Sequence, residues 1–285
     1  MNIIQAHNAR LYTGMRIVIK IGTSSLTYST GRLNYRYVKE LVAVVSDLKN
    51  MGHEIVLVSS GAMGVGLGKV SLQKKPAETD KRRALAAIGQ SSLMSIYEEL
   101  FGAYDCQVAQ VLITKSALQN EADKYDIASA FSRMFEFGVL PIVNENDVVA
   151  SDAMKSVDKF GDNDTLSAYV AEFIEANILI ILSDIDGLYD SDPRSNPDAK
   201  IVPLVTDVSA DILKMAGGAG TARGTGGMAT KLNAACIVMA SGIDMVITNS
   251  SRPENMYGIV AGEEIGTLFS GSGNNKRISN HLRKA

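Results

Sequence analysis

The sequence predicts an α/β protein, a three-layer αβα sandwich around a mainly parallel sheet. Short apolar runs of strand length alternate with helical patterns through nearly the whole chain of 285 residues. The strand segments are continuously apolar, which is typical of strands buried on both faces. No internal repeat and no low-complexity linker divides the sequence. Strand–helix alternation of this kind favours one parallel sheet with helices on both sides.

The predicted sheet begins with Arg16–Ile21, a short run rich in β-branched residues. A helix is expected over Tyr35–Asn50, because its apolar residues recur at helical spacing. Asn34 is suited to cap the start of this helix, and Gly52 is suited to end it. Glu54–Ser59 then returns to the strand pattern and predicts the second strand.

The same two patterns alternate along the rest of the chain. Further helices are expected over Ala84–Phe101, Ile127–Phe137, Asn163–Ile174 and Met228–Ser241. Further strands are expected over Gln107–Ile113, Val139–Asn144, Ile178–Ser183 and Met245–Asn249, with Gly266–Phe269 as a closing edge strand. The expected organisation is an N-terminal arm over 1–14, a domain over 15–271 and a C-terminal tail over 272–285.

Composition excludes several classes of protein. With 46% hydrophobic and 21% charged residues, the chain is neither collagen-like nor disordered. A net charge of −3 gives no basic field, so no nucleic-acid partner is expected. The two Cys and three His share no ligand spacing, which argues against a zinc site or a disulfide framework and fits a reducing cytoplasm. No apolar run approaches the ~18 residues of a membrane span, so a cytoplasmic protein without membrane contact is expected.

Ligands of parallel sheets bind beyond the carboxyl ends of the strands, so the residues there are candidates for a site. Lys20 ends the first strand, and the following Gly22 lets the backbone approach a ligand closely. The stretch Gly224–Lys231 opens the last long helix, where backbone N–H groups, two hydroxyls and Lys231 gather at a helix N-terminus. Both arrangements are suited to bind anions, but a single Lys at a strand end can equally be a solvated edge residue.

Lys20 and Lys231 lie far apart in the sequence, and each stands beside a glycine-rich anion cradle. Together they imply a polyanion between them. Phosphoryl transfer fits, because its transition state spreads negative charge over oxygens that the protein positions and neutralises. Two close lysines repel each other, so a carboxylate is expected between them, and Asp162 is the best candidate.

The glycine-rich stretch has a second interpretation. Gly224–Ala229 matches GxGxxA, the relaxed fingerprint of dinucleotide-binding folds. That fingerprint requires a strand directly before it, and residues 215–223 have no strand pattern. A dehydrogenase is therefore not favoured, and the spacing of a Walker A motif is absent.

The other strand ends carry polar or glycine-rich stretches. Ser59–Gly68 either opens a helix that binds an anion or forms a flexible turn. Asn144–Asp147 could hold an ammonium group, orient other side chains or form a surface turn. Gly161–Thr165 carries more acids and amides than one helix cap needs. Asp184 and Asp186 could bind a metal or a nucleotide, or form an Asx turn.

Six motifs between roughly Arg16 and Gly271 follow one another in the order found in the amino acid kinase family, which the sequence therefore resembles. The motifs are Val18–Leu26 (VIKIGTSSL), Gly52–Ala62 (GHEIVLVSSGA), Pro141–Ala150 (PIVNENDVVA), Phe160–Ala168 (FGDNDTLSA), Leu182–Pro197 (LSDIDGLYDSDPRSNP) and Gly224–Lys231 (GTGGMATK). Within the family, Thr23 after Gly22 resembles the branch that phosphorylates glutamate, and the GDND and GTGGMATK motifs point the same way.

The resemblance implies ATP-dependent phosphorylation of the L-glutamate γ-carboxylate, giving glutamyl 5-phosphate, the first step of proline biosynthesis. It implies that Lys20 and Lys231 neutralise the transferring phosphoryl group, that Asp162 orients both lysines, and that Ser60, Asp147 and Asn163 bind glutamate. The implied nucleotide site consists of Lys20, Ser183, Asp184, Thr225, Gly226, Gly227, Met228, Ala229, Thr230 and Lys231. Mg²⁺ is implied to be carried mainly by the ATP phosphates, so no protein ligand for a metal is expected.

The sequence departs from the family pattern at three places. Ser183 stands where a Thr is usual, although a hydroxyl remains. The segment Asp152–Lys159 looks a few residues longer than usual. The residues after Gly271 are too few for the RNA-binding-like domain of many relatives, so the short form is expected. The resemblance further implies a homo-oligomer, a dimer or tetramer, and proline as a feedback inhibitor.

Two alternatives stay open at this point. The chain could be another amino acid kinase that acts on acetylglutamate or on a different carboxylate or phosphate. It could also be an amino-acid sensor without catalytic activity, although the presence of both lysines and of Asp162 disfavours this hypothesis. A panel of substrates distinguishes the first alternative, and binding without turnover would support the second.

Overall fold

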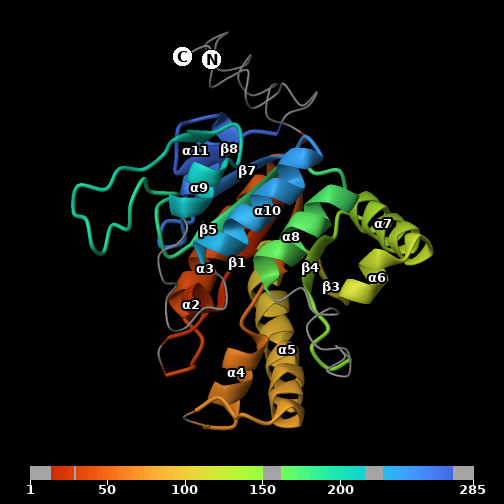
Figure 1. Cartoon of the computed structure of the whole chain (residues 1–285). Coiled ribbons are helices and arrows are strands. Elements are labelled where there is room, and N and C mark those ends of the chain that lie inside the picture. Colours follow the sequence, from red (N-terminus) through yellow and green to blue (C-terminus); the bar gives the residue numbers. More distant parts are fainter. Residues whose placement is uncertain (1–13, 29, 73, 150–161, 216–226, 272–285) are drawn as a thin grey trace.

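Eight strands form one sheet through the middle of the described part of the chain (Figure 1). The computed structural model describes residues 14–28, 30–72, 74–149, 162–215 and 227–271. The strand order is β3-β4-β2-β1-β5-β7-β8-β6, and among these described strands only β7 and β8 pair antiparallel. The strands are β1 (Arg16–Ile21), β2 (Glu54–Ser59), β3 (Val108–Ile113), β4 (Leu140–Glu145), β5 (Ile178–Ser183), β6 (Leu204–Val205), β7 (Asp244–Asn249) and β8 (Thr267–Phe269).

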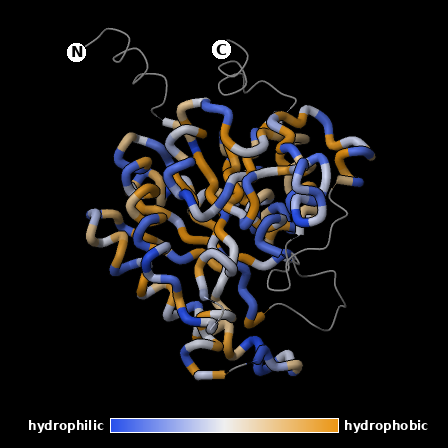
Figure 2. Tube along the Cα trace, turned by 90° about the vertical axis from the view of Figure 1, so that its left-hand side faces the viewer, coloured by the Kyte–Doolittle hydropathy of each residue, from blue (hydrophilic) through white to orange (hydrophobic). Residues whose placement is uncertain are grey.

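Helices cover both faces of the sheet, which confirms the predicted three-layer sandwich. Side chains of α3 (Tyr35–Asn50), α5 (Thr79–Gly102) and α11 (Asn255–Ala261) build the hydrophobic core on one face. Those of α7 (Glu121–Glu136), α8 (Asn163–Phe173) and α10 (Met228–Ala240) build the core on the other. Figure 2 shows hydrophobic segments running through the middle of the trace. Shorter helices complete the connections: α2 (Thr23–Leu26), α4 (Ala62–Lys69), α6 (Lys115–Gln119) and α9 (Ala210–Met215).

Alternation along the strands decides which side chains reach each face. In β1, Val18 belongs to the core beneath α8 and α10. Lys20 lies two residues further on, so it points to the same face. In β4, Ile142 belongs to the core beneath α3 and α5, and Asn144 therefore points towards α5. A cation and an amide thus reach opposite faces of the sheet at its carboxyl edge.

Most predicted elements have the expected bounds, and the differences have physical causes. β1, β2, β5 and α3 match the prediction, and Asn34 caps α3 by accepting a hydrogen bond from the backbone N–H of Tyr37. α5 and α7 begin several residues earlier than predicted, because their first turns are polar and carry no hydrophobic period. The predicted edge position of β8 is wrong, since β6 pairs with β8 and forms that edge.

Glycines bring α4 and α5 unusually close together. A Cβ atom on Gly89 of α5 would lie 1.7 Å from the carbonyl oxygen of Ala62. One on Gly66 of α4 would lie 2.0 Å from the carbonyl oxygen of Leu85. Neither position accepts a side chain without separating the helices, so the backbones set the position of α5 relative to α4. Because α4 starts directly after β2, this contact also positions α5 against the carboxyl edge of the sheet.

Asp244, at the start of β7, provides a test of buried charge away from that edge. Burial raises the pKa of Asp244 to about 6, although its carboxylate accepts a hydrogen bond from the backbone N–H of Gly271. Since the folded-state pKa exceeds the unfolded one, ionisation of Asp244 costs stability as the pH rises from about 4 to 6. Asp244→Asn keeps the acceptor, so it should raise the free energy of unfolding at pH 7.5 by on the order of 1–3 kcal/mol.

Denaturant unfolding at pH 7.5 and pH 4 measures this effect. At pH 4 the native Asp244 carboxyl is protonated, and the gain should shrink to a small fraction of its value at pH 7.5. An equal gain at both pH values would show that the substitution acts through packing and not through charge.

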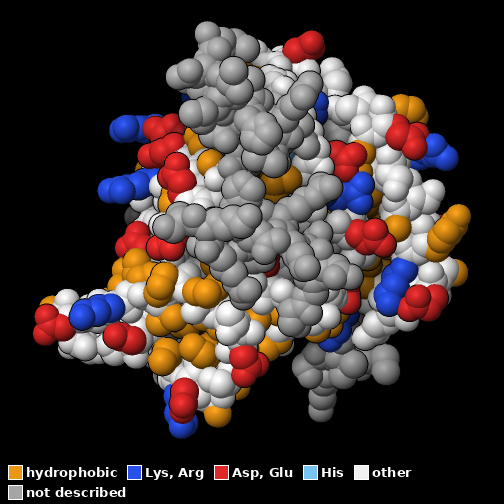
Figure 3. Space-filling view, turned by 90° about the horizontal axis from the view of Figure 1, so that it is seen from above, with side chains coloured by type: hydrophobic (Ala, Val, Ile, Leu, Met, Phe, Trp, Pro, Cys, Tyr) orange, Lys and Arg blue, Asp and Glu red, His pale blue; other side chains and the backbone are white. Residues whose placement is uncertain are grey.

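The described surface carries both signs of charge. In the view of Figure 3, acidic and basic side chains are interspersed around the molecule without a broad field of one sign. None of the helices in the described ranges combines the length and apolar character that a membrane span requires.

Candidate active site

Lys20 and Lys231 meet at one carboxylate, that of Asp164. The Lys20 Nζ lies 2.6 Å from Oδ1 of Asp164, and the Lys231 Nζ lies 3.3 Å from Oδ2. The three side chains are buried, with exposed fractions of 9%, 6% and 0% for Lys20, Lys231 and Asp164. The structure therefore brings together two cations that are separated by most of the chain, and it leaves one net positive charge in the cluster.

Each member of this cluster is placed by a different element. Lys20 comes from the end of β1, where strand alternation directs it towards α8 and α10. Asp164 lies in the first turn of α8, and Lys231 lies in the first turn of α10. Both helices pack together and present their N-termini, where anions are favoured by free N–H groups and the helix dipole.

Asp164 is held in its charged form by its neighbours. Burial alone would raise the pKa of this carboxyl, but the ammonium groups of Lys20 and Lys231 outweigh burial and lower the pKa to about 2. The hydroxyl of Thr230 donates a further hydrogen bond of 2.7 Å to Oδ2. The site therefore keeps a fixed negative charge between the two lysines at any physiological pH.

The prediction that Asp162 lies between the lysines is wrong. Asp162 is the N-cap residue of α8, and its Oδ1 accepts a hydrogen bond of 2.8 Å from the backbone N–H of Thr165. Its Oδ2 accepts from the hydroxyl of Thr165, and burial raises its pKa. With its carboxylate directed at the helix end, Asp162 leaves the pairing with Lys20 and Lys231 to Asp164.

The start of α10 lies against this cluster. Gly227 precedes the helix, and its carbonyl oxygen accepts a hydrogen bond of 2.8 Å from the hydroxyl of Thr230. Thr230 thus ties the helix start to Asp164, while Ala229 is exposed and Met228 is half-buried. Two other residues predicted for this loop, 225 and 226, lie outside the described residues, as do the segment 152–159 and both chain ends.

Ser60 and Asn163, predicted to bind one substrate, lie side by side. The Nδ2 of Asn163 donates a hydrogen bond of 2.8 Å to Oγ of Ser60 and another of 3.0 Å to Oδ1 of Asn144. Asn163 is the first residue of α8, so these contacts join that helix to the ends of β2 and β4. Asn144 in turn donates from Nδ2 to Oε1 of Gln90 in α5, over 2.9 Å.

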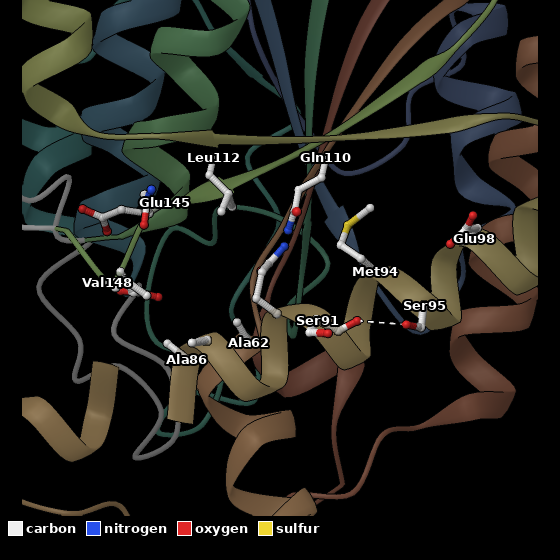
Figure 4. A pocket seen from close by; sticks show the side chains of 14 residues that line it. Ala62, Ala86, Ser91, Met94, Ser95, Glu98, Gln110, Leu112, Glu145 and Val148 are labelled. Atoms are coloured by element: carbon white, nitrogen blue, oxygen red, sulfur yellow. Dashed lines mark hydrogen bonds between the residues drawn. The ribbon is translucent and has the colours of Figure 1, made fainter. Parts of the chain in front are cut away.

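Asp147 lies in the turn after β4 and lines the same cleft as Gln90. This cleft, of about 420 Å³, lies between α5, β3 and the end of β4. Asp147 also lines a hollow of about 130 Å³ together with Lys75, Arg82 and Arg83. Figure 4 shows side chains of α5, β3 and β4 directed into the cleft.

Ser183 and Asp184 mark the end of β5, next to β1. The hydroxyl of Ser183 donates a hydrogen bond of 3.2 Å to Oδ1 of Asp184. The backbone carbonyl of Ser183 accepts from the N–H of Ser250, whose hydroxyl contacts that of Ser25 after β1. In the described residues, no group of three or more His, Cys, Asp or Glu side chains is arranged to hold a metal ion.

The sequence interpretation missed two features of the site. The cap preference of the first acid in Gly161–Thr165 could have identified Asp162 as the cap and Asp164 as the free carboxylate. Gln90 sits in an amphipathic helix, and nothing in the local sequence distinguishes it from a surface residue. Only the fold places it, with 8% exposure, against Asn144.

The family model described as "Amino acid kinase family" matches residues 15–249. Curated proteins named glutamate 5-kinase are similar to the chain over most of its length. The relative from Clostridium perfringens is 51% identical over 254 residues, covering 89% of this chain and 94% of the relative.

Two further relatives bear the same name. The glutamate 5-kinase of Listeria monocytogenes is 44% identical, covering 91% of this chain and 94% of its own. That of Caldanaerobacter subterraneus is 48% identical and covers 90% of this chain, but only 68% of that longer relative is matched. The chain thus matches nearly the whole of some relatives and two thirds of others.

Solved structures share the fold at low sequence identity. Isopentenyl phosphate kinase of T. acidophilum superposes with a TM-score of 0.61 at 17% identity, covering 89% of this chain and 99% of the other. UMP kinase of Bacillus anthracis gives a TM-score of 0.61 at 15% identity, covering 91% and 97%. At such identities the similarity establishes the architecture alone.

Proposed function

The chain belongs to the amino acid kinase family, and we propose that it transfers the γ-phosphoryl group of ATP to the γ-carboxylate of L-glutamate. The product is glutamyl 5-phosphate, and the reaction is the first step of proline biosynthesis. The names of relatives at 42–51% identity support the substrate. The single structural observation that carries the reaction type is the pairing of Lys20 and Lys231 on Asp164.

Both lysines are proposed to contact the transferring phosphoryl group. Its transition state spreads charge over three oxygens and needs positive groups already in place. Asp164 supplies that organisation, because one buried carboxylate holds both ammonium groups near each other without neutralising both. The three side chains together carry a formal charge of +1, which favours an anion.

The acceptor needs no general base in this scheme. A glutamate γ-carboxylate is already ionised at neutral pH, because its ordinary pKa is about 4.3. The described site accordingly presents cations and hydrogen-bond donors near Asp164 and Asn163 rather than an unpaired base. The reaction then depends on holding the glutamate γ-carboxylate and the γ-phosphate of ATP in line, although the two anions repel each other.

Glutamate is proposed to bind between the cluster and the turn after β4. Ser60 and Asn163 lie next to each other on the side of the lysine cluster, and Asn163 immediately precedes Asp164. Asp147 would attract the α-ammonium group. The cationic side chains that line the hollow beside Asp147 favour an acidic substrate: Lys75, Arg82 and Arg83.

The nucleotide is proposed to bind across the ends of β5 and α10. Ser183 and Asp184 would contact the nucleoside, and the residues from 225 to Lys231 would hold the phosphates at the α10 N-terminus. Mg²⁺ usually binds proteins through few carboxylates and mostly through substrate phosphates and water. An ion carried by ATP would add positive charge at the phosphates.

A substrate panel tests the proposal. MgATP with L-glutamate should release ADP, and the same enzyme should be inactive with N-acetylglutamate, aspartate, carbamate and uridylate. Turnover of one of these compounds but not of glutamate would overturn the substrate assignment. Glutamate binding in calorimetry without turnover would favour a sensor.

Membership of the family supports two further proposals, one on regulation and one on the oligomeric state. Proline is proposed to act as a feedback inhibitor, and the protein is proposed to form a homo-oligomer, either a dimer or a tetramer. Titration of the kinase reaction with proline tests the first, and a flat response up to millimolar proline would count against it. Light scattering coupled to gel filtration tests the second.

A further inference from the structure

Gln90 has no part in the proposed chemistry, yet it is buried next to the glutamate side of the site. It is 8% exposed and lies on α5, beside Gly89, whose contact with Ala62 fixes the position of the helix. Its Oε1 accepts a hydrogen bond of 2.9 Å from Nδ2 of Asn144. This contact starts a chain of hydrogen bonds that ends at Ser60.

The direction of every bond in this chain is set by one backbone group. The N–H of Glu145 can only donate, and it donates to Oδ1 of Asn144 over 2.9 Å. The amide of Asn144 is therefore oriented with its oxygen towards Asn163, which must present Nδ2. The other end, Nδ2 of Asn144, then requires an acceptor, and Gln90 provides it.

The same logic orients the two groups that face the substrate. Nδ2 of Asn163 uses both of its hydrogens, one on Asn144 and one on Oγ of Ser60. The Ser60 oxygen is thus an acceptor from Asn163, and its own hydrogen is free to donate to a ligand. Oδ1 of Asn163 is left to accept.

We propose that Gln90 is a positioning residue: it accepts from the Nδ2 that the Glu145 N–H contact leaves on Asn144, and so holds the Asn144 amide where it orients Asn163 and Ser60, with Ser60 donating to a substrate carboxylate and Asn163 accepting from the substrate ammonium group. This assignment rests on the proposed function, because it needs an amino acid in the site. It explains why a buried amide on a helix outside the catalytic cluster faces the substrate pocket. Loss of the acceptor would leave a buried Nδ2 unpaired, so the Asn144 amide would shift from its place and disturb the orientation of Asn163.

The test compares two substitutions whose side chains are nearly as long as that of glutamine. Gln90→Met removes the acceptor, and Gln90→Glu keeps an oxygen opposite Nδ2 of Asn144. Gln90→Met should raise KM for glutamate about tenfold, the order expected for one unpaired buried donor, and leave KM for ATP within twofold. Gln90→Glu should lose less glutamate affinity than Gln90→Met, although its buried charge beside an acidic substrate keeps it weaker than wild type. Glu99→Gln, at an exposed position of α5 outside the cleft lining, serves as the matched control and should change neither KM.

A second pair keeps the proposal testable if Gln90→Met does not fold. Asn144→Asp replaces the donor by an oxygen, to which the Gln90 amide can donate after turning over. In a Gln90→Glu background no such turn is available, because both partners are then acceptors. The double variant should therefore lose more glutamate affinity than the product of the two single losses.

Three results would overturn the proposal. They are an unchanged KM for glutamate in Gln90→Met, equal losses in Gln90→Met and Gln90→Glu, or strictly multiplicative effects in the double variant. A wild-type enzyme that does not phosphorylate glutamate would instead refute the proposed function. The two failures are distinguished by assaying wild type first.

Discussion

Replacing Lys20 or Lys231 with alanine is expected to lower kcat by about 100-fold or more. Removal of one preorganised charge from a transition state costs on the order of 100- to 1,000-fold in rate. Both ammonium groups lie on the Asp164 carboxylate and are buried, so water cannot replace either of them at full strength. The losses in the double variant should be smaller than the product of the single losses, because the lysines act on one phosphoryl group.

Steady-state kinetics with saturating glutamate and MgATP measure this prediction. Lys39→Ala, an exposed lysine on α3, is the control and should retain the wild-type kcat. Thermal unfolding of each variant checks that the fold persists. A variant with wild-type turnover would remove that lysine from the mechanism.

Asp164→Asn is expected to lower kcat by about 100-fold or more and also to destabilise the protein. Its uncharged amide leaves two buried ammonium groups close together, and its Nδ2 would face one of them. Breaking a buried ion pair by removing one partner typically costs about 3–5 kcal/mol. Asp162→Asn should lose far less kcat and little stability, because asparagine caps helices as well as aspartate does.

The dependence of the free energy of unfolding on pH gives a second measurement of the role of Asp164. Its folded-state pKa, about 2, lies below the unfolded value, so its contribution to stability is present above about pH 4 and is lost between about pH 4 and 2. Asp164→Asn should therefore be less stable than wild type at pH 7, and the difference should shrink towards pH 2. Equal kcat losses in Asp164→Asn and Asp162→Asn would contradict the assignment of distinct roles to these two carboxylates.

The sequence pattern was enough to predict the bounds of those strands whose residues are buried on both faces of the sheet. β1, β2 and β5 are runs of buried apolar residues, and their bounds follow from that property alone. Lys20 is located in the same way, since it ends β1 at the edge where parallel sheets bind ligands. No apolar pattern marks the polar first turns of α5 and α7 or the two-residue strand β6. Partners distant in sequence stabilise these segments.

By itself, the sequence determined the sandwich, the glycine-rich loops and the pair of lysines that imply a phosphoryl group. The tertiary structure decided which acid lies between those lysines, because the cap residue Asp162 and Asp164, two positions later in the first turn, point in different directions. It also decided the place of Gln90, 54 positions from Asn144 in the chain. Hydrogen-bond partners this far apart leave no periodic trace, so only the packed backbone reveals them.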